Sequence, residues 1–145
     1  MYKGIKLTNK EMRYIALFES VTGATVVDCI VDDRLNRIIF VIKEGDAGLA
    51  IGKRGKNIAL LERLTGKKHE IIEFSDDPTQ FIKNALKPAT VREVRMIQRL
   101  DGKPVAVVTV EPRDKGVAIG RNGRNAERLR FLVKRYFQIE NVSIL

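Results

Sequence analysis

The stretch Asp46-Ala-Gly-Leu-Ala-Ile-Gly-Lys-Arg-Gly-Lys-Asn57 recurs 68 residues later as Asp114-Lys-Gly-Val-Ala-Ile-Gly-Arg-Asn-Gly-Arg-Asn125. Seven of the twelve positions are identical, and both copies hold a Gly-x-x-Gly turn with basic residues. The interval is too long for a solenoid period, so it indicates two copies of one small domain. Glycines in such a turn let a sugar-phosphate backbone approach the protein backbone closely.

Composition limits the number of domains and the kinds of partner. A chain of 145 residues can hold two domains near the lower end of the usual size range. We predict them at residues 1–75 and 76–145. Because the junction Ser75-Asp76-Asp77 is barely a linker, we expect the two to be held rigidly together. A net charge of +9 favours a polyanionic partner, nucleic acid first and an anionic membrane second.

The sequence also indicates the cellular compartment. No run approaches the roughly 18 consecutive apolar residues of a membrane-spanning helix, and the first residues lack the apolar stretch of a signal peptide. A single cysteine excludes an internal disulfide and agrees with a reducing compartment. We therefore predict a cytoplasmic protein that does not act at a membrane.

Both halves show the same predicted order of elements: helix, strand, strand, short helix, turn, helix and strand. In the first half, a helix capped at Thr8 or Asn9 ends at Gly23. Strands follow near 27–31, with Asp28 facing solvent, and at 37–43. Asp46 caps the short helix, the next helix buries Ile58, Leu61 and Leu64, and the last strand, 69–74, starts with a solvated His69. Cys29 is predicted to be a small buried side chain.

The second half has its own helix and turn signals. Asp77 caps a helix with Pro78 in its first turn, and its apolar face consists of Phe81, Ile82, Ala85 and Leu86. Residues 91–100 and 104–110 form a hairpin around Asp101-Gly102. A short helix at 115–119, a long helix at 124–137 and a strand at 139–144 complete an α+β fold, in which helices cover a three-stranded sheet in each half.

The turns are the predicted binding site, because their glycines remove side chains where a phosphate must approach. The helix that follows each turn offers unpaired N–H groups to an anion. Ile51 and Ile119 are either an apolar floor for bases or core residues, while Asn57 and Asn125 more plausibly brace the loops than bind a nucleotide. The predicted RNA-binding residues are Ile51, Gly52, Lys53, Arg54, Gly55, Lys56, Ile119, Gly120, Arg121, Asn122, Gly123 and Arg124.

Nothing in the sequence indicates an enzyme. The glycines do not match an ATP-binding loop, since Gly48 precedes Gly52-Lys53 by too few residues and Arg54 occupies the position of the magnesium-binding hydroxyl. The lone His69 and Cys29 give neither a metal-ligand set nor a Cys–His pair. We therefore expect no catalytic residues, no metal and no cofactor.

The order of elements and the two Ile-Gly-x-x-Gly turns resemble the KH domain in its prokaryotic, type II arrangement. Two such domains with almost no linker, and the segment Asn84-Ala85-Leu86-x-Pro88-Ala89, resemble the KH pair of the NusA family of transcription termination and antitermination factors. Segments matching the polymerase-binding and OB-fold domains of the bacterial members are missing, so the chain resembles the short archaeal form. The resemblance implies that each turn clamps about four nucleotides of single-stranded RNA.

Two alternatives stay open at this stage. The turns could bind double-stranded DNA as helix-hairpin-helix motifs, although that motif does not require the strands predicted on both sides. The basic charge could instead serve protein contacts in an adaptor for ribosome or polymerase assembly, and RNA polymerase or a transcription complex is a candidate partner. We expect a monomer. Few aromatic residues, 6% with no Trp, imply binding mainly through phosphates and shallow apolar contacts.

Overall fold

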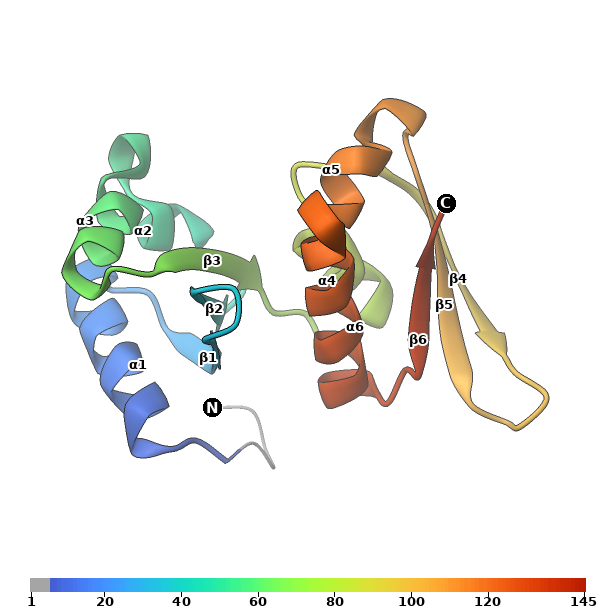
Figure 1. Cartoon of the computed structure of the whole chain (residues 1–145), viewed down its shortest axis with the longest axis horizontal. Helices are drawn as coiled ribbons and strands as arrows, with labels where there is room; N and C mark the ends of the chain where they lie inside the picture. Colours follow the sequence, from blue (N-terminus) through green and yellow to red (C-terminus); the bar gives the residue numbers. More distant parts are fainter. Residues whose placement is uncertain (1–5) are drawn as a thin grey trace. The chain divides into compact units, whose positions relative to one another are not determined.

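The computed structural model describes residues 6–145, which divide into two compact units, the first ending at Phe74 and the second comprising Ser75–Leu145 (Figure 1). The first contains α1 (Asn9–Thr22), β1 (Val26–Asp32), β2 (Arg37–Ile42), α2 (Ala47–Ile51), the 3-10 turn η1 (Lys53–Gly55), α3 (Lys56–Thr65) and β3 (Lys68–Glu73). The second contains α4 (Pro78–Ala85), β4 (Val91–Gln98), β5 (Pro104–Val110), η2 (Pro112–Asp114), α5 (Lys115–Ile119), η3 (Arg121–Gly123), α6 (Arg124–Phe137) and β6 (Asn141–Ile144).

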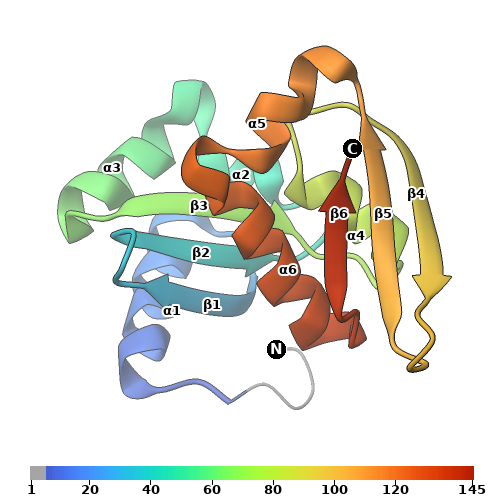
Figure 2. The same ribbon diagram turned by 45° about the vertical axis from the view of Figure 1, so that its right-hand side comes forward.

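Each unit is built on a three-stranded mixed sheet, with the order β1-β2-β3 in the first and β4-β5-β6 in the second (Figure 2). The first two strands of each sheet form an antiparallel hairpin, and the third lies parallel to the second. Parallel neighbours need a long crossover, and the two helices that flank the Gly-x-x-Gly turn provide it. The predicted α+β fold, with helices and a three-stranded sheet in each half, is confirmed.

The helices of the first unit cover one face of their sheet. Its core brings together Phe18 of α1, Ala50 of α2, Leu61 of α3 and Phe40 of β2, all 0% exposed. The rings of Phe18 and Phe40 stack with centroids 4.2 Å apart. This packing fixes both ends of the α2–α3 turn, so the position of the turn follows from the core.

The second unit packs α4 and α6 in the same way. The predicted apolar faces are confirmed, since Phe81 and Ile82 of α4 and Leu129, Leu132 and Val133 of α6 are all fully buried. Phe81 meets Tyr136 edge to face, with ring centroids 5.5 Å apart. The predicted helix caps at Thr8 and Asp77 are confirmed as well, each side chain accepting a backbone N–H of its first turn.

Three predicted environments in the first unit are wrong. Asp28 is buried rather than solvated, because a bulge between Val26 and Asp28 shifts the register of β1; its carboxylate accepts the N–H of Cys29 at 2.8 Å. His69 is also buried, since β3 pairs with the buried strand β2 and turns the imidazole toward Phe40. Leu64 is 56% exposed, because the three-residue step from Leu61 rotates it about 60° away.

Residues 6–145 contain neither a membrane-spanning helix nor a metal-binding cluster. None of the helices there combines the length and apolar character needed to cross a bilayer. No group of three or more His, Cys, Asp or Glu side chains in the same range is placed to hold a metal ion.

Candidate nucleic-acid interface

The two turns have almost the same backbone conformation. In the first, α2 ends at Gly52, with φ 77° and ψ 170°, and α3 begins after Gly55 in the left-handed region. In the second, Gly120 has φ 80° and ψ 166°, and Gly123 is again left-handed. The duplicated sequence therefore corresponds to a duplicated conformation, and a helix begins directly after each turn. The first N–H of each helix, that of Lys56 or Arg124, is bonded to the carbonyl of Lys53 or Arg121, so the N–H groups that follow are the ones a helix N-terminus can offer to an anion.

The two glycines of a turn are required for different reasons. A Cβ atom on Gly52 would lie 2.8 Å from the side chain of Asn57, and one on Gly120 would lie 2.8 Å from that of Asn125. At Gly55 a Cβ would meet nothing within 4 Å, but the φ of +72° still disfavours other residues. The first glycine is therefore fixed by contact and conformation together, and the second by conformation alone.

The asparagines after the turns brace them. Asn57 donates from Nδ2 to the carbonyl of Leu49 at 2.8 Å, and Asn125 donates in the same way to Val117 at 2.9 Å. Each bond joins the helix after the turn to the helix before it. The bracing role that the sequence favours is confirmed.

The predicted helix cap at Asp46 is wrong, and both aspartates that open the repeats bind elsewhere. Asp46 precedes the short helix α2, but its side chain makes no capping hydrogen bond there. Its Oδ2 accepts the N–H of Thr25 at 2.8 Å instead, and Asp114 accepts the N–H of Thr90 at 2.9 Å. The aspartates thus tie each short helix to the start of the first strand of its unit.

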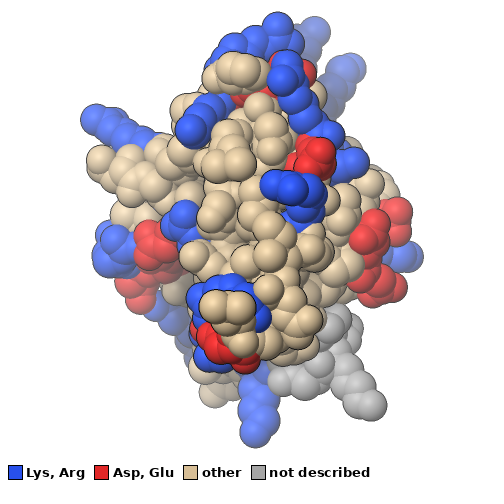
Figure 3. Space-filling model, turned by 90° about the vertical axis from the view of Figure 1, so that its right-hand side faces the viewer, with Lys and Arg blue, Asp and Glu red and all other residues tan. Residues whose placement is uncertain are grey.

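Basic side chains occupy the exposed parts of both turns. Lys53, Arg54 and Lys56 are exposed or half-buried in the first turn, as is Arg121 in the second, while Arg124 is half-buried and donates from Nε to the carbonyl of Arg121 at 3.3 Å. Figure 3 faces the side of the second sheet, where Lys and Arg gather at the upper end, at the height of α5 in Figure 1, and the middle is largely uncharged.

One residue in each turn holds a backbone conformation that side chains usually avoid. Arg54 and Asn122 occupy the same position of the repeat, and both have a φ of 56°. Asn tolerates the left-handed region, whereas Arg is strained there. Strain at an exposed basic residue that contributes nothing to the core is typical of a functional position.

Apolar side chains beside the turns are exposed. Ile51 is 45% exposed and Ile119 is half-buried, so the sequence alternative in which Ile51 belongs to the core is excluded. Leu49 and Val117, which the sequence analysis missed, are 52% and 50% exposed. The sequence could have identified them, because both are large apolar residues at the same position of the repeat, next to the buried alanine of each short helix.

The structure brings the predicted site residues together as two sets, one in each unit. Residues 51–56 all lie on the α2–η1–α3 turn, and residues 119–124 all lie on the α5–η3–α6 turn. Each set combines helix N–H groups, at least two basic side chains and an exposed apolar edge. Such a surface can hold a phosphate backbone on one side and the flat faces of bases on the other.

Comparison with known proteins supports this interpretation of the fold. The model of the NusA-like second KH domain matches residues 78–144, and a KH domain model matches residues 12–76. The "Probable transcription termination protein NusA" of Methanocaldococcus jannaschii is 35% identical over 97% of this chain and 75% of its own length. The protein of that name from Halococcus morrhuae is 38% identical, over 97% and 98%. The crystal structure of APE1850 covers 96% of this chain, with 40% identity and a TM-score of 0.83.

Proposed function

Since the chain belongs to the NusA-like family of tandem KH-domain proteins, we propose that it binds single-stranded RNA. Each Gly-x-x-Gly turn holds a short run of sugar-phosphate backbone, about four nucleotides long. Lys53, Arg54 and Lys56 face phosphates at the first turn, and Arg121 and Arg124 do so at the second. The chain itself carries out no catalysis in this proposal.

The observation that carries the proposal is the duplication of an entire local geometry. A helix begins directly after each turn, and both copies contain the same hydrogen bonds from an Asn side chain to a carbonyl and from a Thr N–H to an Asp carboxylate. A corner that served only the fold would not need exposed basic side chains or a strained Arg54. A ligand that presents the same chemical groups to each turn accounts for what the two copies share.

Single-stranded RNA fits these turns better than duplex DNA does. Leu49 and Ile51 lie exposed beside the first turn, and Val117 beside the second, where unpaired bases can lie against them. A duplex keeps its base faces stacked inside and would leave these apolar side chains without a partner. Binding to duplex DNA is therefore the alternative outcome of the test below.

Charge reversal in each turn tests the proposal. We expect Lys53→Asp with Arg54→Asp, and separately Arg121→Asp with Asn122→Asp, to weaken binding to single-stranded RNA by about 1–3 kcal/mol, the scale of charge-assisted hydrogen bonds. The control is Arg99→Asp with Lys103→Asp on the β4–β5 hairpin, which changes the net charge as much as the first pair does. Equal losses of RNA affinity in all three proteins would mean that net charge alone causes the effect. Unchanged affinity in both turn variants would refute RNA binding by the turns.

RNA length and salt concentration give a second test. If both turns act on one RNA, affinity should rise until the oligomer reaches roughly a dozen nucleotides, through effective concentration. The logarithm of the binding constant should fall by about 0.7 per phosphate contact per logarithm of salt. An affinity that stops rising at about five nucleotides would leave a single working turn.

For the cellular role, we infer that the protein acts on RNA in transcription termination or antitermination, with RNA polymerase and the transcription complex as candidate partners. The inference rests on relatives named as probable transcription termination proteins. Termination efficiency on a defined template, with parent protein and the Lys53→Asp/Arg54→Asp variant, tests it. Recovery of polymerase with the parent before but not after nuclease treatment would show an association that depends on RNA.

A further inference from the structure

Phe131 stands out among the aromatic residues of the chain. Among residues 6–145 it is the only Phe or Tyr that is exposed, at 49%, while the others are buried or half-buried. It lies on α6, the helix that begins at the second Gly-x-x-Gly turn. An exposed aromatic ring in a chain this poor in aromatics is a feature that the fold does not explain.

The position of Phe131 on α6 connects it to the second turn. Arg124, Arg128, Phe131 and Arg135 are spaced by four, three and four residues, and such residues lie on one stripe of a helix. The stripe starts at the turn itself with Arg124. At 1.5 Å per residue, Phe131 lies about 10 Å further along the helix axis than Arg124. An RNA strand that leaves the turn can cover this distance.

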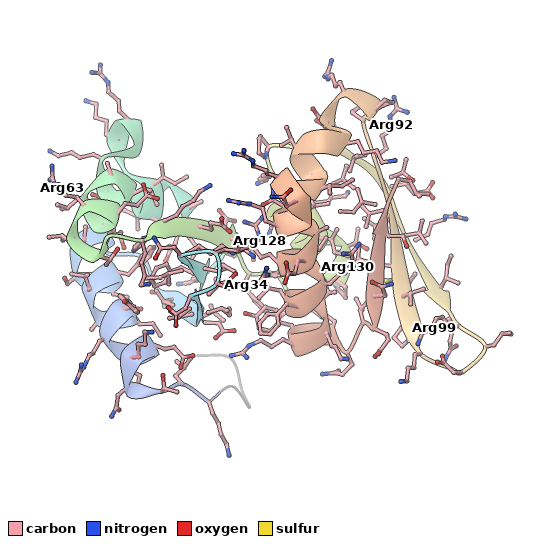
Figure 4. The ribbon with its side chains drawn as sticks, viewed as in Figure 1. Arg34, Arg63, Arg92, Arg99, Arg128 and Arg130 are labelled. Carbon is pink, nitrogen blue, oxygen red and sulfur yellow. The ribbon has the colours of Figure 1, made fainter. Side chains whose placement is uncertain are left out.

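The ring and the arginines of this stripe are held in place. The guanidinium of Arg135 lies over the Phe131 ring, 5.9 Å from its centroid. Arg128 donates from Nη2 to the carbonyl of Ala85 in α4 at 2.9 Å, whereas Arg130 donates to the carbonyl of Val142 in β6. Figure 4 shows Arg128 and Arg130 leaving α6 on opposite sides. The stripe therefore holds one pre-oriented ring between Arg124 and Arg135, while Arg128 is bonded to α4.

We propose that this stripe extends the second clamp along α6, and that Phe131 is a stacking platform for a base beyond the nucleotides held by the turn. The base lies on the face of the ring opposite Arg135, and Arg124 and Arg135 face the adjoining phosphates. This proposal rests on the proposed RNA binding. It adds one base-binding position to the second unit, which should therefore prefer a longer RNA.

The first unit has no aromatic residue at the equivalent position. Shifted by the interval of the repeat, Phe131 corresponds to Arg63 on α3, which is exposed and has no aromatic ring. Stacking on an aromatic side chain contributes about 1–3 kcal/mol per base, and a flexible surface Arg contributes less. The proposal therefore predicts an asymmetry, with the longer footprint on the second unit.

A tryptophan probe can test the stacking directly, because the chain contains no Trp. Phe131→Trp in the full chain gives a single indole at the proposed platform, and we expect single-stranded RNA of roughly eight nucleotides, two clamp lengths, to quench its fluorescence. Leu100→Trp is the matched control, since Leu100 is fully exposed and belongs to the loop between β4 and β5. Figure 1 shows this loop at the end of the second unit away from α5. We expect that indole to keep its fluorescence.

Affinity measurements with two RNA lengths complete the test. We expect Phe131→Ala to weaken binding of the RNA of roughly eight nucleotides by about 5- to 150-fold and to leave an RNA of about four nucleotides unaffected. Phe131→Leu keeps an apolar side chain and should weaken binding almost as much. An indole that stays unquenched in the Phe131→Trp protein, or a loss that is equal for both lengths, would overturn the platform. RNA that binds the parent but not the Lys53→Asp/Arg54→Asp and Arg121→Asp/Asn122→Asp variants would still support the clamps.

Discussion

The two units share their turns but differ in the side chains that their sheets carry at equivalent positions. In the first, the buried Arg37 of β2 forms ion pairs with Asp32 at 2.9 Å and with Glu70 at 3.2 Å. In the second, the register of the strands places the half-buried Val105 and the exposed Ile97 and Ser143 at the corresponding positions. The turns, by contrast, repeat even their hydrogen bonds. This is the pattern expected if the turns, and not the sheets, hold the ligand proposed above.

The largest expected effect would come from removing the centre of the ion-pair network. Arg37→Ala leaves Glu70 as a buried carboxylate without this cation, so we expect the free energy of unfolding of the first unit to fall by about 3–5 kcal/mol. Val105→Ala, its counterpart, should cost no more than about 1.5 kcal/mol. Denaturant unfolding followed by NMR signals from each unit separates the two.

The network also gives a control in which none of its three charges is left behind. Replacing Arg37 by Met together with Asp32 and Glu70 by Leu removes the whole network at once, and it should restore most of the stability. If Arg37→Ala cost no more than Val105→Ala, the ion pairs would be irrelevant to stability and the contrast between the two sheets would have no energetic meaning.

The next effect concerns what the turns have in common. We expect Gly52→Ala and Gly120→Ala each to destabilise its unit by about 2–3 kcal/mol, because the backbone conformation is nearly exclusive to Gly and the new Cβ meets an Asn side chain. Gly55→Ala should cost only about 1–2 kcal/mol, the penalty of the left-handed conformation. Thermal unfolding of the three variants tests this order.

A double mutant separates the two causes at the first glycine. Adding Asn57→Ala to Gly52→Ala removes the contact with the Asn57 side chain, but it keeps the contact with the backbone nitrogen at 3.0 Å and the strained conformation. The loss on adding Gly52→Ala should therefore be smaller when Asn57 is already Ala. Equal losses in both backgrounds would mean that the backbone conformation alone requires this glycine.

Much of the architecture was predictable, because its signals are local. Caps such as Thr8 and Asp77, the Asp101-Gly102 turn and the apolar periodicity of α6 depend on residues close in sequence. The repeat itself identified both turns. The buried His69 and the hydrogen bond from the Thr25 N–H to Asp46 were not predictable, because they depend on residues that are distant in sequence. Phe131 escaped for a related reason, since helical spacing cannot tell which side of α6 remains uncovered.

A smaller effect, limited to acidic pH, concerns how the stability of each unit depends on pH. Burial lowers the pKa of His69 below its ordinary value of about 6.5, although its hydrogen bond to the carbonyl of Lys67 and the charge of Glu62 act in the opposite direction. Below pH ~6.5 the unfolded first unit therefore binds more protons than the folded one. Its stability should fall as the pH drops through this value, and the fall should end below the lowered pKa.

The second unit has Val142 at the corresponding position of its sheet and should lack this component. Hydrogen exchange at about pH 7.5 and pH 5.5, read separately for each unit, measures the difference, and His69→Gln should abolish it in the first unit. A parent and a His69→Gln protein with the same pH dependence would show that the imidazole titrates as it does in the unfolded chain.

The smallest effect on stability is expected from exchanging the residues at the one strained position of the two turns, Arg54 and Asn122. Arg54→Asn relieves a left-handed Arg, so we expect it to stabilise the first unit by about 0.5–1 kcal/mol, and Asn122→Arg to destabilise the second by a similar amount. RNA affinity should move the other way, falling in the first variant and rising in the second, because each exchange shifts one positive charge. Thermal unfolding and RNA titration of both variants at several salt concentrations supply the measurements. If Arg54→Asn stabilised the fold and left affinity and salt dependence unchanged, the strain at Arg54 would have no function in RNA binding. The first turn would then hold RNA with Lys53 and Lys56 alone.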